Sequence, residues 1–431
     1  MPTALDILYA VAVGALAPFW ARKRRAAWGE RFGRVPREVA ARLRQRGRPR
    51  LLIHAVSVGE VSALRTLVPR LTGEVEVVIA TTTDTGFARA TALFGAACVV
   101  VRYPLDFSGA VRRFLEDVKP DAVALVELEV WPQFIRACAA RGVPVAVING
   151  RLSAKSLRGY RRIRWIIKGA FGALAQAAVQ DEDYRARFVA MGTPAERVTV
   201  TGNMKWDSAL EQLDARGEGI MPGAEALGAA LGIERTRPLI VAGSTAEGEE
   251  ALLHGACPPG VQLLCAPRKP ERFAEAARAL PGCVRRSEIS GGTESARTGA
   301  TGADRFLLDT LGELRAAYAL ADVVVIGRTF FSLGGSDPLE AIGVGKAVVS
   351  GPSFANFGTI TAALEEAGAI EIVAAEGLGA KLAELLNDPQ RRGAMSAAGA
   401  ACIRGHAGAT ERHAILLRRL ATEACAARRQ G

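Results

Sequence analysis

The sequence predicts an α/β protein with two similar domains, each a doubly wound parallel sheet with helices on both faces. The chain has 431 residues, of which 49% are hydrophobic, so it can bury two separate cores. Short segments rich in Val, Ile and Leu alternate with longer amphipathic segments along most of the chain. Strands buried in a parallel sheet have this near-continuous apolar composition, and the amphipathic segments supply the connecting helices.

Seven apolar segments predict the strands of the first domain. Between the first two, residues 59–71 place Val61, Leu64, Val68 and Leu71 at steps of three and four residues, which indicates a helix with one apolar face. The strand segments are 50–56, 75–81, 98–104, 122–129, 144–150, 177–181 and 197–202.

The pattern loosens between Asp207 and Arg237, where Gly and Pro gather, so we expect the domain boundary there. A second series of strand segments follows, at 238–243, 261–267, 305–309, 323–327, 346–351 and 369–375. The polar residues 287–304 predict a mobile surface loop. We therefore expect an amino-terminal segment (1–35), a first domain (36–208), a second domain (209–412) and a basic helix (413–431).

The amino-terminal segment is the one stretch with membrane character. Its apolar part, Ile7 to Trp20, is shorter than the roughly 20 residues that a spanning helix needs. Four cations follow at once, at 22–25, as expected for a cytoplasmic flank beside anionic lipid. The segment predicts an interfacial or weakly inserted anchor on the cytoplasmic face of the inner membrane. A buried amphipathic helix is the alternative.

Composition limits the remaining classes. Seven scattered Cys without a CxxC pair favour buried thiols over disulfides, and four His without ligand spacing predict no metal site and no cofactor. The net charge of +11 favours anionic partners, although coding bias toward Arg is an equal explanation. Aromatic residues make up 6%, and no basic stripe interleaved with aromatics indicates nucleic-acid binding.

Polar residues follow the strands of the second domain, at the edge where ligands of such sheets bind. Gly334 and Gly335 would let the backbone approach a ligand closely, and Ser336 or Asp337 could cap the next helix. Its exposed amides attract phosphate, Pro338 and Leu339 occupy its first turn, and Glu340 could accept hydrogen bonds from ribose hydroxyls. An ordinary capped helix after a glycine turn is the alternative.

Three further turns lie at strand ends of the same domain. They contain Ser244 and Thr245, then Pro267 and Arg268, then Leu311, Gly312 and Glu313. Their shared position predicts a nucleotide site. The sequence has neither a GxxxxGK[ST] loop nor a GxGxxG turn after its first strand, which excludes the common ATPase and nicotinamide-binding motifs.

In the first domain, acids and cations follow the strands. Glu60 stands at a strand-to-helix turn, Glu127 and Glu129 end another strand, and Lys205 follows the last one. The helix beginning at Glu60 would favour the ionised carboxylate. Solvated surface charges are the alternative, but acids and cations that share one sheet edge predict a catalytic site.

In these motifs the sequence resembles the bacterial 3-deoxy-D-manno-octulosonic acid (Kdo) transferases, over nearly the whole chain. The resemblance is carried, in order, by WGERFGR, HAVSVGE, TTTDTG, VELEVWP, NGRLSAKS, VTVTGNMKWD, GSTAEGEE, PRKPERF, DTLGEL and DPLEA followed by GKAVVSGPSFANF. So many motifs in one order are more specific than any single motif.

The resemblance implies a GT-B fold, in which two Rossmann-like domains face a central cleft. It implies an inverting transfer of Kdo from CMP-Kdo to a lipid A precursor at the anionic inner-membrane surface. Glu60 would be the general base, and Glu127 with Lys205 would support the transition state. The CMP-binding segments would be Pro267 and Arg268, Leu311 to Glu313, and Asp337 to Glu340.

The sequence departs from the family pattern at four positions. Ser336 and Asp337 stand where the family has His and Asn, and Ala246 and Lys269 each replace a His. Asp337 adds negative charge beside the expected phosphate, although it can cap a helix as Asn does. A GT-B enzyme that uses another nucleotide sugar, such as a UDP-sugar, and a non-catalytic membrane-associated scaffold are the alternative functions.

Overall fold

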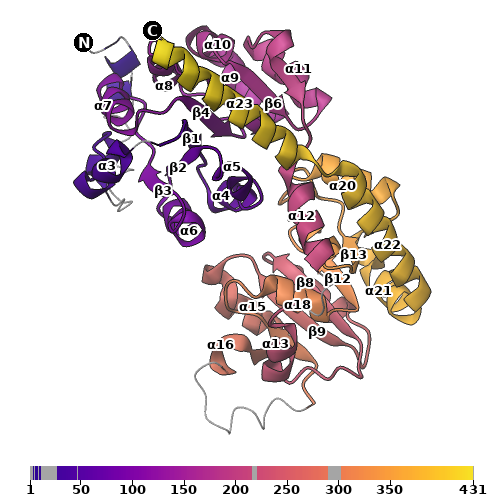
Figure 1. Ribbon diagram of the computed structural model, residues 1–431. Helices are drawn as coiled ribbons and strands as arrows, with labels where there is room; N and C mark the ends of the chain where they lie inside the picture. Colours follow the sequence, from indigo (N-terminus) through magenta and orange to yellow (C-terminus); the bar gives the residue numbers. More distant parts are fainter. Residues whose placement is uncertain are drawn as a thin grey trace. The chain divides into compact units, whose positions relative to one another are not determined.

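The computed structural model describes residues 3, 5–7, 9–10, 27–45, 47–215, 221–289 and 302–430. It divides into two compact units, each with its own parallel sheet (Figure 1). Unit 1 comprises Met1–Ser208 and Ala407–Gly431, and unit 2 comprises Ala209–His406. The predicted class, two α/β domains with parallel sheets, is confirmed.

Unit 1 contains a seven-stranded sheet in the order β3-β2-β1-β4-β5-β6-β7, with every neighbouring pair parallel. The order reverses between β1 and β4, so the loops after these two strands diverge at the sheet's carboxyl edge. The strands are β1 (Arg50–His54), β2 (Glu76–Thr81), β3 (Val99–Arg102), β4 (Ala122–Val126), β5 (Val145–Gly150), β6 (Gln176–Val179) and β7 (Val198–Val200).

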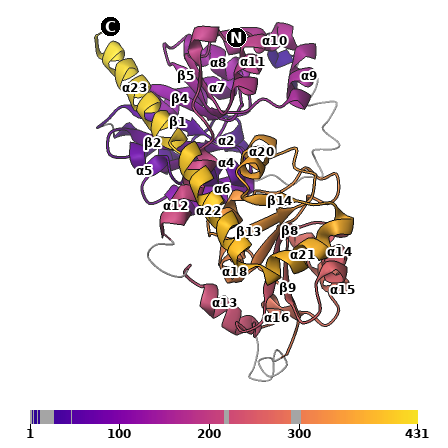
Figure 2. The same ribbon diagram turned by 90° about the vertical axis from the view of Figure 1, so that its right-hand side faces the viewer.

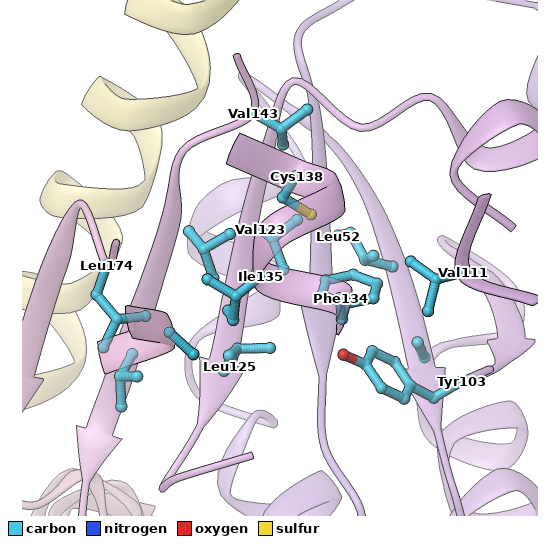
Figure 3. Close-up of a cluster of buried hydrophobic side chains, with 14 of the residues drawn as sticks. Leu52, Tyr103, Val111, Val123, Leu125, Phe134, Ile135, Cys138, Val143 and Leu174 are labelled. Carbon is cyan, nitrogen blue, oxygen red and sulfur yellow. The ribbon is translucent and has the colours of Figure 1, made fainter. Parts of the chain in front are cut away.

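Helices cover both faces of this sheet, because alternate strand residues point to opposite faces and both sets are apolar. Leu52 of β1 belongs to one core cluster, together with Val123 and Phe134 (Figure 3), whereas Ile53 belongs to the cluster on the other face. The helices are α2 (Trp28–Arg31), α3 (Arg37–Arg44), α4 (Val58–Ala63), α5 (Val68–Leu71), α6 (Asp84–Phe94), α7 (Ser108–Val118), α8 (Pro132–Ala139), α9 (Ala154–Arg162), α10 (Arg164–Gly172), α11 (Glu182–Met191), η1 (Ala195–Arg197) and α23 (Ala409–Gln430). A further helix, α12 (Met204–Ala215), begins in unit 1 and continues into unit 2 from Ala209.

The last helix, α23, belongs to unit 1. Leu417 and Ala421 lie in the same core cluster as Ile53, and the Asp207 carboxylate accepts hydrogen bonds from the N–H groups of Gly408 (2.7 Å) and Thr410 (3.2 Å). The sequence-based boundary at 412 therefore differs from the structure, in which one continuous helix begins at Ala409 and packs on unit 1. The apolar face of the helix extends across the expected boundary.

Unit 2 contains a second parallel seven-stranded sheet, in the order β10-β11-β9-β8-β12-β13-β14 (Figure 2). Its strands are β8 (Leu239–Thr245), β9 (Gln262–Pro267), β10 (Val284–Arg285), β11 (Arg305–Leu307), β12 (Val323–Ile326), β13 (Ala347–Ser350) and β14 (Ile370–Ile372). Six of these match the expected segments, and the two-residue β10 was not anticipated. Most of the expected loop at 287–304 lies outside the described residues.

The helices of unit 2 pack on both faces of its sheet. Tyr318 of α18 is fully buried against Gly243, where even a Cβ atom would collide with the tyrosine hydroxyl. The helices are α13 (Ala224–Leu231), α14 (Glu249–Ala256), η3 (Pro270–Arg272), α15 (Phe273–Ala279), α16 (Arg286–Ile289), α18 (Leu314–Leu320), α19 (Leu339–Ile342), α20 (Gly358–Glu366), η4 (Ala375–Gly377), α21 (Leu378–Asn387) and α22 (Pro389–His406).

The start of the expected anchor is fastened to unit 1. The Asp6 carboxylate accepts hydrogen bonds from the N–H (2.8 Å) and hydroxyl (2.6 Å) of Ser108, and Tyr9 donates to Asp106 at 3.0 Å. Residues 11–26, which carry most of the apolar run and its cations, lie outside the described residues. Within the described ranges, no helix has both the length and the apolar character needed to cross a bilayer.

A buried arginine fixes the amino edge of the unit 1 sheet, and its removal should destabilise that unit. The Arg50 guanidinium is paired with Glu76 at 3.0 Å and donates to the carbonyls of Val118 and Leu43, both at 2.6 Å. Arg50→Met would leave these acceptors without a donor, so we expect urea unfolding to show a loss of about 3–5 kcal/mol. The matched change at exposed Arg42 should cost under about 0.5 kcal/mol, and equal losses would contradict this assignment.

Candidate functional site

Glu60 lies at the carboxyl edge of the unit 1 sheet, as the third residue of α4, the helix that follows β1. Ser57 caps α4, and its hydroxyl donates to Glu60 Oε1 at 2.8 Å. The Val56 N–H donates to Glu60 Oε2, also at 2.8 Å. This arrangement is a variant of the capping box, and it holds the half-buried carboxylate in one orientation.

Two further glutamates end β4, the strand next to β1. Glu127 has φ of 63° and Glu129 has φ of 21°, values that side chains with a Cβ rarely adopt. The Glu127 backbone is held on both sides, since its N–H donates to Ile148 and its carbonyl accepts from Arg151, both at 3.0 Å. Strained backbone that neighbouring contacts enforce is typical of functional sites, because it aims side chains that a regular strand would turn away.

Arg151 and Lys205 supply the positive charge next to Glu127. Both cations lower the pKa of Glu127, whereas burial, the largest influence, raises it, and the net direction is upward. Lys205 follows Met204, whose N–H donates to the Asn149 Oδ1 at 3.1 Å, and the Asn149 N–H donates to His413 Nε2 at 3.2 Å. The carboxyl-terminal helix α23 thus supports the loop that positions the two cations.

Burial also dominates the ionisation of Glu60. Removal from water raises its pKa, the bonds from Val56 and Ser57 oppose this, and the nearby charges of Glu127 and Glu129 raise it further. The net direction is upward. The expectation that the helix terminus favours the ionised form is therefore wrong in its net effect, because burial and two like charges outweigh one short helix.

Glu129 belongs to a second network that the sequence did not indicate. Its Oε2 accepts a hydrogen bond from the Trp131 indole at 2.7 Å and lies 3.8 Å from Nε2 of His54, which is fully buried. The His54 ring stacks on Tyr103 with centroids 3.5 Å apart, and its Nδ1 lies 3.0 Å from the Ala80 carbonyl. Burial raises the pKa of Glu129, but His54 and the Trp131 indole lower it, and the net direction is downward. The pKa values of Glu129 and Glu127 are therefore shifted in opposite directions.

In unit 2, the loop after β12 is organised by a buried acid, Glu249. Its carboxylate accepts four backbone N–H groups, from Ala246 (2.9 Å), Arg328 (2.6 Å), Thr329 (2.9 Å) and Phe330 (3.2 Å). The side chain is 0% exposed. This one carboxylate therefore joins the loops after β8 and β12 at the carboxyl edge of the sheet.

Gly334 and Gly335 end that loop, and both need to be glycine. Each has φ of 79°, and a Cβ on Gly334 would lie 2.5 Å from the Asn356 side chain. The Gly335 N–H is already donated to the Arg328 carbonyl at 2.9 Å, and the Gly334 N–H to Ser353 Oγ at 3.2 Å. In this conformation, the turn's two glycine amides are used to close the loop.

Thr245 is buried and supports the loop, so it is not exposed to a substrate. Its hydroxyl donates to Glu250 at 2.6 Å, Arg272 pairs with the same carboxylate at 2.9 Å, and Thr245 is 1% exposed. The neighbouring Ser244 is only partly buried and has φ of 58°. Of these two candidate substrate contacts, Ser244 alone has accessible surface for a ligand, and Thr245 packs beneath it.

Pro267 ends β9, and Arg268 follows it with an exposed side chain. The Arg268 N–H donates to the Thr245 carbonyl at 3.1 Å, so the loops after β8 and β9 are joined. Within the described part of the chain, the Arg268 guanidinium forms no hydrogen bond or ion pair, so it is available to bind an anionic ligand.

The third segment, Leu311 to Glu313, precedes α18. Leu311 is 74% exposed, and Gly312 has φ of 95°. Arg286 donates to Glu313 at 3.0 Å, and Thr310 also donates to that carboxylate. Glu313 is therefore held in place, while Leu311 offers an apolar surface to solvent.

The segment from Ser336 to Glu340 forms the turn into the short helix α19. The Asp337 Oδ1 accepts a hydrogen bond from the Leu339 N–H at 3.1 Å, so the carboxylate is bound to the first residue of α19, but Pro338, and not the expected Ser336 or Asp337, occupies the N-cap position. Glu340 lies 3.8 Å from Arg315 and keeps 38% of its side chain exposed. Ser336 is buried, and its hydroxyl has no partner among the described residues.

The structure thus gathers the candidate residues into two groups, one at the carboxyl edge of each sheet. Electrostatic contacts link Glu60 with Glu127, and Glu127 with Lys205, inside unit 1. In unit 2, the charges of Arg268, Asp337 and Glu340 all act on buried Tyr318. The described ranges contain no group of three or more His, Cys, Asp or Glu placed to hold a metal ion.

Comparisons with known proteins identify the family of the chain. The family model described as 3-Deoxy-D-manno-octulosonic-acid transferase (kdotransferase) matches residues 26–208. A 3-deoxy-D-manno-octulosonic acid transferase of Bordetella pertussis is 36% identical, with 94% of this chain and 97% of that protein covered. The enzyme of the same name from Haemophilus influenzae is 30% identical over 85% of this chain and 86% of its own length.

Solved structures support the fold. A glycosyltransferase from Rickettsia africae covers 87% of this chain with a TM-score of 0.59 at 10% identity, and 99% of that protein is matched. This likeness shows a fold of two parallel-sheet α/β domains of the GT-B kind. Taken with the identities above, which extend over nearly the full length of both relatives, it leads to one conclusion: the chain belongs to the 3-deoxy-D-manno-octulosonic acid transferase family.

Proposed function

We propose that this protein is an inverting glycosyltransferase that moves Kdo from CMP-Kdo to a hydroxyl of a lipid A precursor. Family membership supports the reaction. The observation that carries the mechanism is the group of Glu60, Glu127, Arg151 and Lys205 at one sheet edge, with burial raising the pKa of both acids.

Glu60 is the proposed general base. A sugar hydroxyl is a weak nucleophile, and a carboxylate that accepts its proton during attack makes the oxygen more reactive. A raised pKa makes Glu60 a stronger base than an ordinary glutamate, and the bonds from Val56 and Ser57 keep it in position. One base with no second nucleophile predicts direct displacement and inversion.

The cations have the complementary task. The transferred sugar carries a carboxylate, and the leaving CMP carries a phosphate, so negative charge grows as the bond breaks. Lys205 and Arg151 can stabilise negative charge on the sugar carboxylate, and Arg268 can stabilise it on the CMP phosphate. The partly buried Glu127 carboxylate interacts electrostatically with Arg151 and Lys205, so it limits the net charge of this group.

For the donor, we propose a site formed by the strand-end loops of unit 2. Arg268 would contact the phosphate, Glu340 the ribose hydroxyls, and exposed Leu311 the face of the base. The Asp337 carboxylate accepts the Leu339 N–H just as the amide oxygen of an Asn would, so the local fold does not require Asn there.

For location, we propose the cytoplasmic face of the inner membrane, where a phosphorylated lipid acceptor is available. The net charge of +11 supports an anionic membrane surface as a partner.

Replacement of the base tests the mechanism. Glu60→Gln should lower kcat by about 100- to 10,000-fold in a transfer assay with CMP-Kdo and a lipid A precursor, while CMP affinity stays unchanged. Glu182→Gln, at an exposed acid of the same unit, is the control and should keep full activity. Equal turnover by wild type and Glu60→Gln would remove the assignment.

The pH profile gives an independent test. Since the base acts when deprotonated and its pKa is raised, activity should be lost on acidification at a pH above the ordinary glutamate value of 4.5. Glu127→Gln removes one like charge, so it should move the acidic limb of kcat/KM toward lower pH. A limb that stays in place would show that Glu60 does not sense Glu127.

The pairing of Lys205 with Glu127 predicts non-additive effects. Lys205→Met should lower kcat by about 100-fold, and Glu127→Gln with Lys205→Met should lower it far less than the product of the single losses. Lys119→Met, at an exposed cation of the same unit, is the control. Independent, multiplying effects would argue against one functional group.

The buried acid of unit 2 should matter for nucleotide binding. Glu249→Gln cannot accept all four loop N–H groups, so calorimetry should show CMP affinity lowered by about 10-fold or more, with faster hydrogen exchange at Arg328 to Phe330. Glu247→Gln, two residues earlier and exposed, should change neither.

Titration with UDP under the same conditions separates the donor classes: tighter binding of UDP than of CMP would contradict a CMP-sugar donor.

A further inference from the structure

The corner between α9 and α10 carries the most exposed large apolar side chain among the described residues. Trp165, at the start of α10, is 81% exposed, and Ile163, the residue that joins the two helices, is 41% exposed. A protein in water normally buries tryptophan to a large extent. Two exposed apolar residues at one helix corner therefore need an explanation.

Cations surround this corner. Residues 152–180 contain no Asp or Glu. Six exposed cations lie in the same stretch: Lys155, Arg158, Arg161, Arg162, Arg164 and Lys168. Within the part of the chain that the structure describes, none of the six side chains forms a hydrogen bond or an ion pair. The surface is therefore positively charged and has no internal compensation.

The neighbouring helix does not neutralise these charges. α11 packs beside α9 and α10 (Figures 1 and 2) and begins with Glu182 and Asp183. Those two acids are already paired within α11, Glu182 with Arg185 at 3.6 Å and Asp183 with Arg187 at 2.6 Å. Asp181, which is nearer in sequence, caps α11 by accepting the Tyr184 N–H at 2.8 Å, so all three acids are engaged with their own helix.

The helix α9 packs on unit 1 through side chains that are only partly buried. No residue of α9 is fully buried, and Leu157 and Tyr160 are partly buried against the core cluster around Phe134. The helix starts at Ser153, whose hydroxyl accepts a hydrogen bond from the Ser156 N–H at 3.1 Å, two residues after Arg151 of the candidate site. Most of α9 therefore remains available on the outside of the unit.

We propose that the α9–α10 corner, with Ile163 and Trp165 at its tip, is a surface that docks on an anionic phospholipid bilayer. Tryptophan prefers the interface between headgroups and acyl chains, because its ring is amphipathic. Arginine and lysine side chains reach headgroup phosphates while their stems stay on the apolar side. An apolar tip within a ring of cations matches both layers of such an interface.

The position of the corner adds a consequence for the proposed transfer reaction. α9 has nine residues, which corresponds to about 13 Å of helix between the corner and the end of β5. Docking would hold the site that contains Arg151 about that far from the headgroups. A lipid acceptor could then present its sugar to Glu60 without leaving the bilayer.

The inference rests on the proposed membrane location, and its test measures binding rather than transfer. Full-length wild type and variants are sedimented with vesicles of phosphatidylcholine alone or mixed equally with phosphatidylglycerol. The triple change Arg161→Glu, Arg162→Glu, Arg164→Glu should lower partitioning onto the anionic vesicles by about 100-fold or more. The control reverses Arg278, Arg404 and Arg419, three exposed arginines elsewhere, and should lower it far less.

A second measurement detects the tip directly. Spin-labelled lipid should quench part of the tryptophan fluorescence of the wild type on anionic vesicles, and Trp165→Phe should remove that part. Trp165→Ser should weaken partitioning by about 10-fold, whereas Ile415→Ser, at a side chain 54% exposed on α23, should not. Quenching that is unchanged in Trp165→Phe would overturn the proposal even if another segment also binds lipid.

Two further outcomes separate this inference from others. Transfer to a detergent-dispersed acceptor should be unaffected by the triple change, so loss of that activity would show damage to the enzyme rather than to docking. If the triple change abolished binding of a single-stranded oligonucleotide and left vesicle binding intact, the surface would belong to a nucleic-acid partner and the proposal would be wrong.

Discussion

Carboxylates buried at the carboxyl edges of the two sheets determine how the loops around both candidate sites are held. A carboxylate leaves water only when hydrogen bonds or cations replace its hydration. Glu60 obtains a backbone N–H and a hydroxyl, Glu127 obtains Arg151 and Lys205, and Glu249 obtains four backbone N–H groups. Each solution fixes the loop that supplies it.

The three carboxylates have different roles because their surroundings differ. Glu249 is wholly enclosed, so its negative charge serves the fold of one loop. Glu60 is only half-buried, so its raised pKa can act on a ligand. Glu127 lies between these cases, because the cations beside it oppose the effect of burial. Similar side chains at equivalent sheet edges thus reach three different roles through their surroundings.

Much of the fold could be predicted from the sequence, because buried parallel strands are continuous apolar segments that local inspection can find. The strand β10 could not, since two residues carry no periodicity. The return of α23 to unit 1 was also missed. The apolar face of that helix is visible in the sequence, but the unit on which it packs is decided by distant partners such as Asp207.

The candidate site was only partly predictable, for a related reason. Glu60, Glu127 and Lys205 stand out because they follow strands and match family motifs. The sequence does not show that the buried Thr245 hydroxyl donates to Glu250, or that Glu249 accepts four backbone N–H groups. Nor does it show that Glu129 accepts from the Trp131 indole and lies near His54. Nor does a local rule give the direction of the Glu60 pKa, which burial and charges from β4 determine.

Tertiary burial, opposed by only two hydrogen bonds, makes Glu60 a stronger base than an isolated glutamate. The most direct test is the titration of its side-chain carboxyl carbon by NMR in the full-length protein, with the signal assigned by its loss in Glu60→Gln. We expect a midpoint above the ordinary glutamate value of 4.5. A midpoint at or below that value would contradict it.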